Sequence, residues 1–212
     1  MEFSKDKVDN SISIKGIIKE GLKFSHTAYG IDFYSFKLGV KRKSGYEDIL
    51  PVIISENTIG DKAYGVGDVV ELIGRLRSHN ADSSVNVYIF VEQINSILTS
   101  NFEFNNTVHI RGFVCKKPIF RSTPKNRVIT DMVIAANRQN SKKSDYINTI
   151  AWGSRAVESK ELGVGDEIII EGRFQSRKYT KKLKTCEKEK IAYELSVLNI
   201  KKIGSNAKMN NH

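Results

Sequence analysis

Apolar and polar residues alternate with a period of two in short stretches throughout the chain. Clear examples are SISIKG at 11–16, NTVHIRG at 106–112 and INTIAW at 147–152. Because successive side chains of a strand point to opposite faces, this alternation predicts strands that bury one face. Helical periodicity is scarce: 55–68 and 154–166 could each hold one short helix, the second ending at Gly163 as a left-handed cap. The pattern predicts an all-β protein.

The chain also contains an internal duplication. GVGDVVELIGRLRS at 65–78 and GVGDEIIIEGRFQS at 163–176 align without a gap, at an offset of 163 − 65 = 98 residues. Two further pairs follow in the same order: 11–19 resembles 107–116, and 85–94 resembles 191–200. Similar segments that recur in the same order indicate two copies of one structural unit.

Each copy predicts five short strands with room for one helix between the third and the fourth. This is the layout of the OB-fold, a small Greek-key barrel that binds oligonucleotides, although the pattern leaves an SH3-like barrel open. We therefore expect two tandem five-stranded OB-fold barrels, each with at most one short helix. The predicted boundaries are 1–95 for the first barrel, 96–105 for a linker, 106–203 for the second barrel and 204–212 for a disordered tail.

Charge separates the two copies. The whole chain holds 34 Lys and Arg against 24 Asp and Glu, a net charge of +10. Residues 1–100 hold 12 basic and 13 acidic residues, and residues 101–212 hold 34 − 12 = 22 and 24 − 13 = 11, so all of the surplus lies in the second copy. Since Lys and Arg gain affinity for nucleic acid by releasing counterions from phosphates, the second copy is the better candidate for binding it.

Several functional classes fit the sequence poorly. No stretch is apolar enough to span a membrane, and the amino terminus lacks the apolar centre of a signal peptide, so we expect a cytoplasmic protein. Cys115 and Cys186 are isolated, which predicts neither a disulfide framework nor a zinc site. The histidines are scattered, and no phosphate-cradling or nucleophile motif is present. We expect no catalysis, cofactor or metal.

Two parts of the second copy carry aromatic residues that could contact bases, and one of the two is strongly basic. Tyr146 and Trp152 lie six residues apart on one predicted strand and therefore on one face. The next predicted hairpin carries a dense basic run with one tyrosine, namely Arg173, Arg177, Lys178, Tyr179, Lys181 and Lys182. Rings that stack on bases and cations that follow phosphates together bind single strands with little sequence preference.

Each of these aromatics also has a purely structural alternative. Trp152 lies close to Ile147 and Ile150 and could fill the barrel, as we expect of Phe113. Tyr146 follows a polar run at a predicted strand start, and Tyr179 has lysines on both sides, so both favour the surface.

The second copy resembles the bacterial single-stranded-DNA-binding protein family over 106–203. The resemblance rests on NTVHIRGFVCKKPIFRSTP at 106–124, VIAANRQ at 133–139, YINTIAWGSRA at 146–156 and the GDEIIIEGRFQSRKY block. It implies base stacking by the same three aromatics, Tyr146, Trp152 and Tyr179. It also implies phosphate contacts by basic residues around Arg121, Arg138, Arg173, Arg177 and Lys178.

Two departures from the family concern its partners. The family usually ends in an acidic tip that recruits replication proteins, whereas this chain ends in KKIGSNAKMNNH, so such recruitment is not expected. The family usually assembles four barrels, which predicts a homodimer for a chain with two.

The first copy lacks the features that mark the second. At the 98-residue offset, Asp48 stands in place of Tyr146 and Ile54 in place of Trp152, and the hairpin is short, with HNADSSVN after Ser78. We therefore expect the first barrel to be mainly architectural. Its remaining candidates for DNA contact are Lys41, Arg42, Lys43, Tyr46, Arg75 and Arg77.

The sequence thus predicts a protein that binds and protects single-stranded DNA in replication, repair or recombination. Two alternatives remain: a primosome-type accessory module that chiefly binds proteins, and an RNA-binding barrel, since stacking does not distinguish ribose from deoxyribose.

Overall fold

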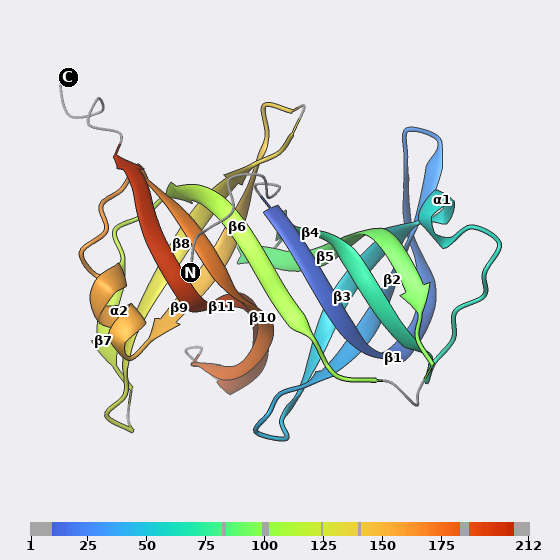
Figure 1. The fold of residues 1–212 in the computed structure, drawn as a ribbon, viewed down its shortest axis with the longest axis horizontal. Coiled ribbons are helices and arrows are strands. Elements are labelled where there is room, and N and C mark those ends of the chain that lie inside the picture. Colours follow the sequence, from blue (N-terminus) through green and yellow to red (C-terminus); the bar gives the residue numbers. More distant parts are fainter. Residues whose placement is uncertain are drawn as a thin grey trace.

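The protein is all-β in a computed structural model that describes residues 10–81, 84–98, 102–123, 125–139, 141–182 and 187–205 (Figure 1). Its first half contains β1 (Asn10–Ala28), β2 (Ile31–Lys41), β3 (Glu47–Ser55), α1 (Glu56–Ile59), β4 (Val69–Ala81) and β5 (Ser84–Ser96). Its second half contains β6 (Asn106–Val114), β7 (Ile119–Ser122), β8 (Val128–Asn137), β9 (Ser144–Trp152), α2 (Ser154–Ser159), β10 (Asp166–Lys182) and β11 (Glu187–Ser205).

Strand pairing closes a ring of five strands. In the first half β1 pairs with both β2 and β4, and the circuit continues through β3 and β5, which are parallel. The second half has the same circuit through β6, β8, β9, β11 and β10, with β7 added as a short edge strand on β8. The all-β class and a closed five-stranded barrel of OB type, with a short helix after the third strand, are confirmed.

The alternating pattern produces the buried core. Ile12 and Ile14 of β1 and Val108 and Ile110 of β6 are buried, while the polar residues between them face outward. The same alternation buries Ile147 on β9. Burying these branched apolar side chains supplies the main driving force for closing the strands into a ring.

The repeated GVGD sequence forms the same turn in both halves. The backbone N–H of Gly65 donates to the Asp68 carboxylate at 2.8 Å, and that of Gly163 donates to Asp166 at 2.8 Å. The third residue of each turn is a glycine with positive φ, which is +86° at Gly165. The prediction that α2 ends at Gly163 is wrong, because the helix ends at Ser159 and the left-handed glycine belongs to the turn.

The two rings form one continuous sheet. β1 pairs antiparallel with β6, so that Asn10 lies opposite Ile110 and Ile14 opposite Asn106. The two halves are therefore joined directly by backbone pairing. At the other end of the chain, β11 continues through Gly204 and Ser205 because both pair with β10, and the rest of the predicted tail, 206–212, lies outside the described residues.

Two buried carboxylates join the rings in a reciprocal way. Asp48 of β3 accepts hydrogen bonds from the backbone N–H and hydroxyl of Ser176, at 2.8 and 2.9 Å. Asp145 of β9 accepts the backbone N–H of Ser78, also at 2.8 Å. In Figure 1 the β2–β3 loop accordingly lies beside β10. Each half thus holds the fourth strand of the other with a carboxylate from its own third strand.

This symmetry corrects the alignment of the third strands. Asp48 and Asp145 have the same contacts and differ by 145 − 48 = 97 residues, so the offset here is 97, not 98. Ile49, half-buried on the outer face, therefore corresponds to Tyr146, and Asp48 does not. The carboxylate of Asp48 does not lie on the outer face, because Asp48 is 1% exposed and paired with Arg42.

The same correction applies at the end of the strand. Ser55, and not the buried Ile54, corresponds to Trp152. A one-residue slip moves a side chain to the other face of a strand, which is why the gapless alignment mixed inner with outer positions.

Candidate nucleic-acid interface

The outer face of β9 carries the two predicted stacking aromatics. Tyr146 is 44% exposed and Trp152 is half-buried, whereas Ile147 and Ala151 point into the core and are buried. The register of β9 on β8 is unbroken from Ser144 to Trp152. The side chains of Tyr146 and Trp152 therefore share one face of β9, at a spacing of roughly 20 Å. The strand therefore presents two separate aromatic surfaces outward.

A groove lies on this side of the second ring and includes Asn148 of β9 in its lining. We call it the β9 groove; its volume is about 290 Å³, and its lining includes Lys116, Lys117, Asp131, Asn148, Arg177, Tyr179 and Glu194. These residues come from the end of β6, from β8 and β9, and from the β10–β11 hairpin. Asn148 lies between the two aromatic positions of β9, so the groove and the aromatic face are one surface.

Both carboxylates of the β9 groove are paired with arginines, whereas two of its lysines have no acidic partner among the described residues. Arg121 donates to the Asp131 carboxylate at 2.7 Å, and Arg177 forms an ion pair with Glu194 at 3.0 Å. The hydrogen bond to Glu194 is the main cause of a raised pKa of Arg177. Lys116 and Lys117 are exposed and have no acidic partner among the described residues. The groove thus offers cations and amide groups without a free carboxylate.

The β10–β11 hairpin adds a third aromatic ring. Tyr179 is 38% exposed, and the guanidinium of Arg177 lies 5.8 Å from its ring centroid. Lys178 is exposed and makes a loose 3.8 Å ion pair with Glu189. The side chains of Lys181 and Lys182 lie outside the described residues, although their backbone continues β10.

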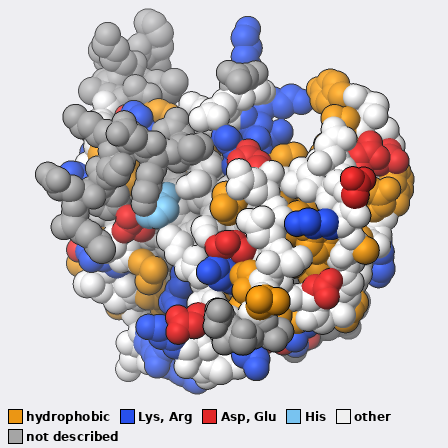
Figure 2. All heavy atoms as spheres, turned by 45° about the vertical axis from the view of Figure 1, so that its right-hand side comes forward, with side chains coloured by type: hydrophobic (Ala, Val, Ile, Leu, Met, Phe, Trp, Pro, Cys, Tyr) orange, Lys and Arg blue, Asp and Glu red, His pale blue; other side chains and the backbone are white. Residues whose placement is uncertain are grey.

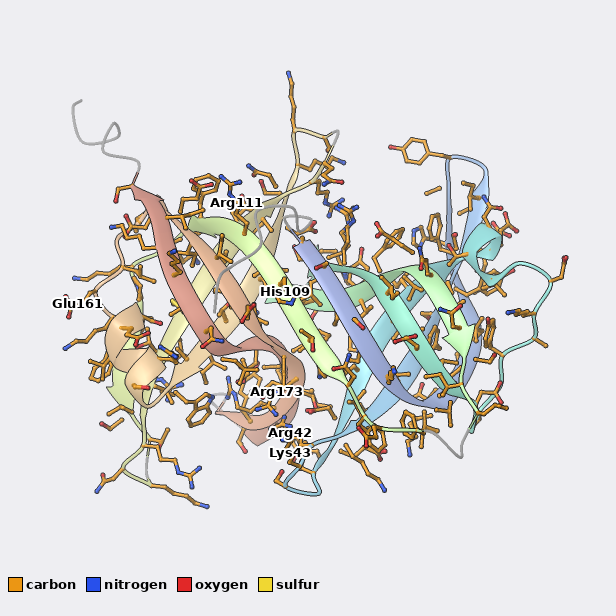
Figure 3. All side chains as sticks on the ribbon, viewed as in Figure 1. Arg42, Lys43, His109, Arg111, Glu161 and Arg173 are labelled. Carbon is orange, nitrogen blue, oxygen red and sulfur yellow. The ribbon has the colours of Figure 1, made fainter. Side chains whose placement is uncertain are left out.

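Two predicted phosphate contacts lie at the junction of the rings instead. Arg138 donates to both oxygens of Asp145, at 2.9 and 2.7 Å, and to the carbonyl of Ser78. The hydrogen bond to Asp145 is the main cause of the raised pKa of Arg138. Arg173 is half-buried at the base of the hairpin, beside Arg42 and Lys43 (Figure 3). Arg138 therefore holds the two rings together.

The first half has a corresponding groove with different aromatics. Its lining includes Lys37 of β2, His79 of β4 and Tyr88 of β5, together with Tyr193, which comes from β11 of the second half. The Lys37 ammonium lies 5.7 Å from the Tyr193 ring centroid, and the ring centroids of His79 and Tyr88 lie 5.6 Å apart. Burial raises the pKa of both tyrosines. Sequence reasoning missed this cluster because one member belongs to the other half.

The remaining candidates of the first half divide into two groups. The arginines are used internally: Arg42 pairs with Asp48, Arg77 with Asp145, and Arg75 with Glu92. By contrast Lys41, Lys43 and Tyr46 are exposed in the β2–β3 region. On the face seen in Figure 2, Lys and Arg side chains gather at the upper and lower edges, with apolar and acidic groups between them.

Other kinds of site are not found in the described part of the chain. No group of His, Cys, Asp and Glu there could hold a metal ion, and no described helix is long and apolar enough to cross a membrane. Cys115 is a free, half-buried thiol whose pKa is raised mainly by burial.

Solved structures with this fold include two from Thermus aquaticus. The wild-type single-stranded DNA binding protein matches with a TM-score of 0.72 and 17% identity over 92% of this chain and 93% of that one. A deletion mutant of it matches with a TM-score of 0.70 and 18% identity, over 95% of this chain and 98% of that one. At this identity the likeness establishes the fold alone.

Curated relatives match a shorter region. Single-stranded DNA-binding protein 2 of Streptococcus agalactiae serotype V is 32% identical over 82 residues, which is 36% of this chain and 63% of that protein. The single-stranded DNA-binding protein of Deinococcus radiodurans is 32% identical over 84 residues, which is 36% of this chain and 28% of that protein. The match thus spans less than two thirds of either relative.

The second ring carries the family relationship. The model of the single-strand binding protein family matches residues 105–203, from the start of β6 into β11, and so includes the β9 groove and its three aromatics. The second ring, over residues 105–203, thus matches the single-strand binding protein family.

Proposed function

We propose that the chain binds single-stranded DNA in the β9 groove without strong sequence preference. Bases stack on Tyr146, Trp152 and Tyr179, and phosphates contact exposed cations beside them, namely Lys116, Lys117 and Lys178, with Lys181 and Lys182 as predicted from the sequence. The observation that carries the proposal is the outward aromatic face of β9 above a groove whose carboxylates are already paired. Stacking contributes about 1 to 3 kcal/mol per base.

The proposal includes a division of labour between two tandem OB-fold domains. The first, 1–95, is mainly architectural; 96–105 is the linker; and the second, 106–203, binds DNA. The pseudo-symmetric pairing circuits support the division, as does the internal use of Arg42, Arg75 and Arg77. The proposed role is in DNA replication, repair or recombination, processes that expose single strands; the relatives are named for binding single-stranded DNA.

We further propose that two chains form a homodimer with four barrels. The family resemblance supports this arrangement, and light scattering coupled to size-exclusion chromatography measures it directly. A mass of twice 23.9 kDa is the expected result, and a mass of 23.9 kDa at micromolar concentration contradicts it.

Titration with single strands tests the DNA-binding proposal. Oligo-dT of about 35 nucleotides, a matched duplex and oligo-U are added while the fluorescence of Trp152, the sole tryptophan, is followed at two salt concentrations. We expect quenching by dT, much weaker duplex binding, and a slope of log K against log salt of about −0.7 per phosphate neutralised.

The other outcomes identify the alternatives. If dT does not bind even at low salt, the accessory-module alternative replaces DNA binding. Tighter binding of oligo-U than of dT assigns the groove to RNA, which a contact to the 2′-hydroxyl would explain. Tight dT binding without quenching removes Trp152 from the interface and leaves the other two aromatics.

A further inference from the structure

The two junctions between the rings are alike in architecture but differ in charge. At one junction Arg75 forms an ion pair with Glu92 and donates to Gln139 at 3.0 Å. At the other junction the corresponding residue is Arg173, since 173 − 75 = 98, and it has no acidic or hydrogen-bonding partner among the described residues. Of the two corresponding arginines, Arg75 is therefore compensated, and Arg173 is not compensated by any described residue.

Two lysines add to this difference. The loops that hold the two junctions correspond at an offset of 138 − 42 = 96, since Arg42 and Arg138 make the same bidentate contacts with Asp48 and Asp145. At that offset the neutral Asn137 and Gln139 of one loop correspond to residues 41 and 43 of the other. Those two residues are lysines, both exposed, and neither has an acidic partner in the described ranges.

These three cations line one groove between the rings. The seam groove, as we call it, has a volume of about 190 Å³ and is lined by Lys41, Lys43 and Arg173, with Arg42 and Asn106 beneath them. Its one carboxylate, Asp48, is buried and already bound by Arg42. Figure 3 shows Arg42, Lys43 and Arg173 together where the β2–β3 loop meets β10. Three unpaired positive charges around a concave surface attract an anion.

The seam groove continues the β9 groove along one face of β10. From Gly172 to Lys182 the register of β10 on β11 has no shift, so Arg173, Gln175, Arg177 and Tyr179 point to the same side. The first two line the seam groove and the last two line the β9 groove. They span roughly 20 Å of strand. An extended polyanion lying along this face therefore passes from one groove into the other.

We propose that the seam groove binds the phosphate backbone of a single strand that leaves the β9 groove toward the first ring. This inference rests on the proposed function and extends it. The second ring supplies the stacking aromatics and Arg173, and the first ring supplies Lys41 and Lys43. The opposite junction lacks this arrangement, because its arginine is paired and its loop has Asn137 and Gln139 at the corresponding positions, with its lysines, Lys142 and Lys143, further along the loop.

The length and salt dependence of binding test the proposal. Fluorescein-labelled dT of about 4 and about 35 nucleotides is bound to the wild-type chain and to a Lys41→Gln, Lys43→Gln, Arg173→Gln variant, and affinity is followed by anisotropy. Each lost phosphate contact removes about 0.7 from the salt slope, so the variant should lose up to about 2 with the long strand. Between about 50 and 200 mM salt, the wild-type affinity for the long strand should therefore fall about 18-fold more than the affinity of the variant. The short strand, which fits in the β9 groove, should show no change.

Two controls separate the seam groove from general charge effects. Arg75→Gln removes the corresponding, paired arginine and should leave the salt slope of the long strand unchanged. A second triple variant keeps Lys41→Gln and Lys43→Gln but carries Arg173→Lys. Because it retains one of the three cations, it should recover about a third of the lost slope.

The possible results distinguish this inference from the proposed function. An unchanged slope for the triple variant with the long strand, while the wild type binds dT, overturns the seam groove alone. An equal loss for short and long strands, or for Arg75→Gln, also overturns it. Failure of the wild type to bind either strand overturns DNA binding as a whole.

Discussion

Replacing Asp145 with Asn should weaken the junction between the rings. The Asp145 carboxylate is 1% exposed and accepts four hydrogen bonds, from Arg77, Ser78 and twice from Arg138, at 2.7 to 3.0 Å. Asn keeps the shape of the side chain but loses the charge and places an N–H₂ group against guanidinium donors. Both arginines then lose their acidic partner.

The size of the effect follows from burial. Removing one partner of a buried ion pair costs about 3 to 5 kcal/mol. The side chains of Arg77 and Arg138 are 19% and 27% exposed, so water can partly solvate them after the substitution. We therefore expect about 3 kcal/mol, at the lower end of the range. With a urea dependence of about 2 kcal/mol per molar, the unfolding midpoint should fall by about 1.5 M.

Urea unfolding followed by Trp152 fluorescence and by far-ultraviolet circular dichroism measures this change. Glu158→Gln is the matched control, since it removes an exposed ion pair with Arg155 whose side chains are 37% and 48% exposed. Such pairs contribute about 0 to 0.5 kcal/mol. If Asp145→Asn lowers the midpoint no more than Glu158→Gln does, the junction is not a stabilising element and the reasoning fails.

Three further predictions concern the interface, the sheet and acid stability. Tyr146→Ala should weaken dT binding by about 5- to 150-fold, because about 1 to 3 kcal/mol of stacking is lost. The control Tyr29→Asn, at a fully exposed turn position, should not change the affinity. Equal affinities of the two variants in titration would contradict this. Gly172→Ala should lower the unfolding free energy by about 1 to 3 kcal/mol, because an added Cβ meets a carbonyl oxygen of β11 at 2.4 Å. Gly163→Ala is the control in thermal unfolding, since the atom nearest to its added Cβ is 3.7 Å away. Burial alone would raise the pKa of Asp166, but hydrogen bonds from a lysine of β11 and from backbone lower it below 3.8. Its contribution to stability is present above 3.8 and lost as pH falls through the lowered pKa, so the difference between wild type and Asp166→Asn should shrink on acidification; a pH-independent difference would refute it.

Local pattern in the sequence was sufficient to predict the strands and the aromatic face. Period-two alternation depends only on neighbouring residues, so it identified the strands that contain Ile12, Ile110 and Ile147. The GVGD turns are also local, since the contacts within each turn join residues three apart, although the second one was assigned to the end of a helix. The shared face of Tyr146 and Trp152 likewise follows from the strand period.

Alignment of the copies could not be read from the sequence alone. Arg42 and Asp48 are six residues apart, whereas Arg138 and Asp145 are seven apart, so the second loop is one residue longer. A gapless offset therefore placed Asp48 opposite Tyr146. Only the shared contacts of the two carboxylates reveal the true register, because those contacts join residues far apart in the chain.

Only the tertiary structure decided which charges are available. In the sequence Arg138, Arg173 and Arg177 are equally basic, yet two are bound to Asp145 and Glu194 and one has no partner among the described residues. Lys41 and Lys43 join that one from the other half of the chain. The sequence determined the strands and the outward aromatics, since both depend on local period. The folded arrangement determined the free cations, since compensation of charge depends on distance in space.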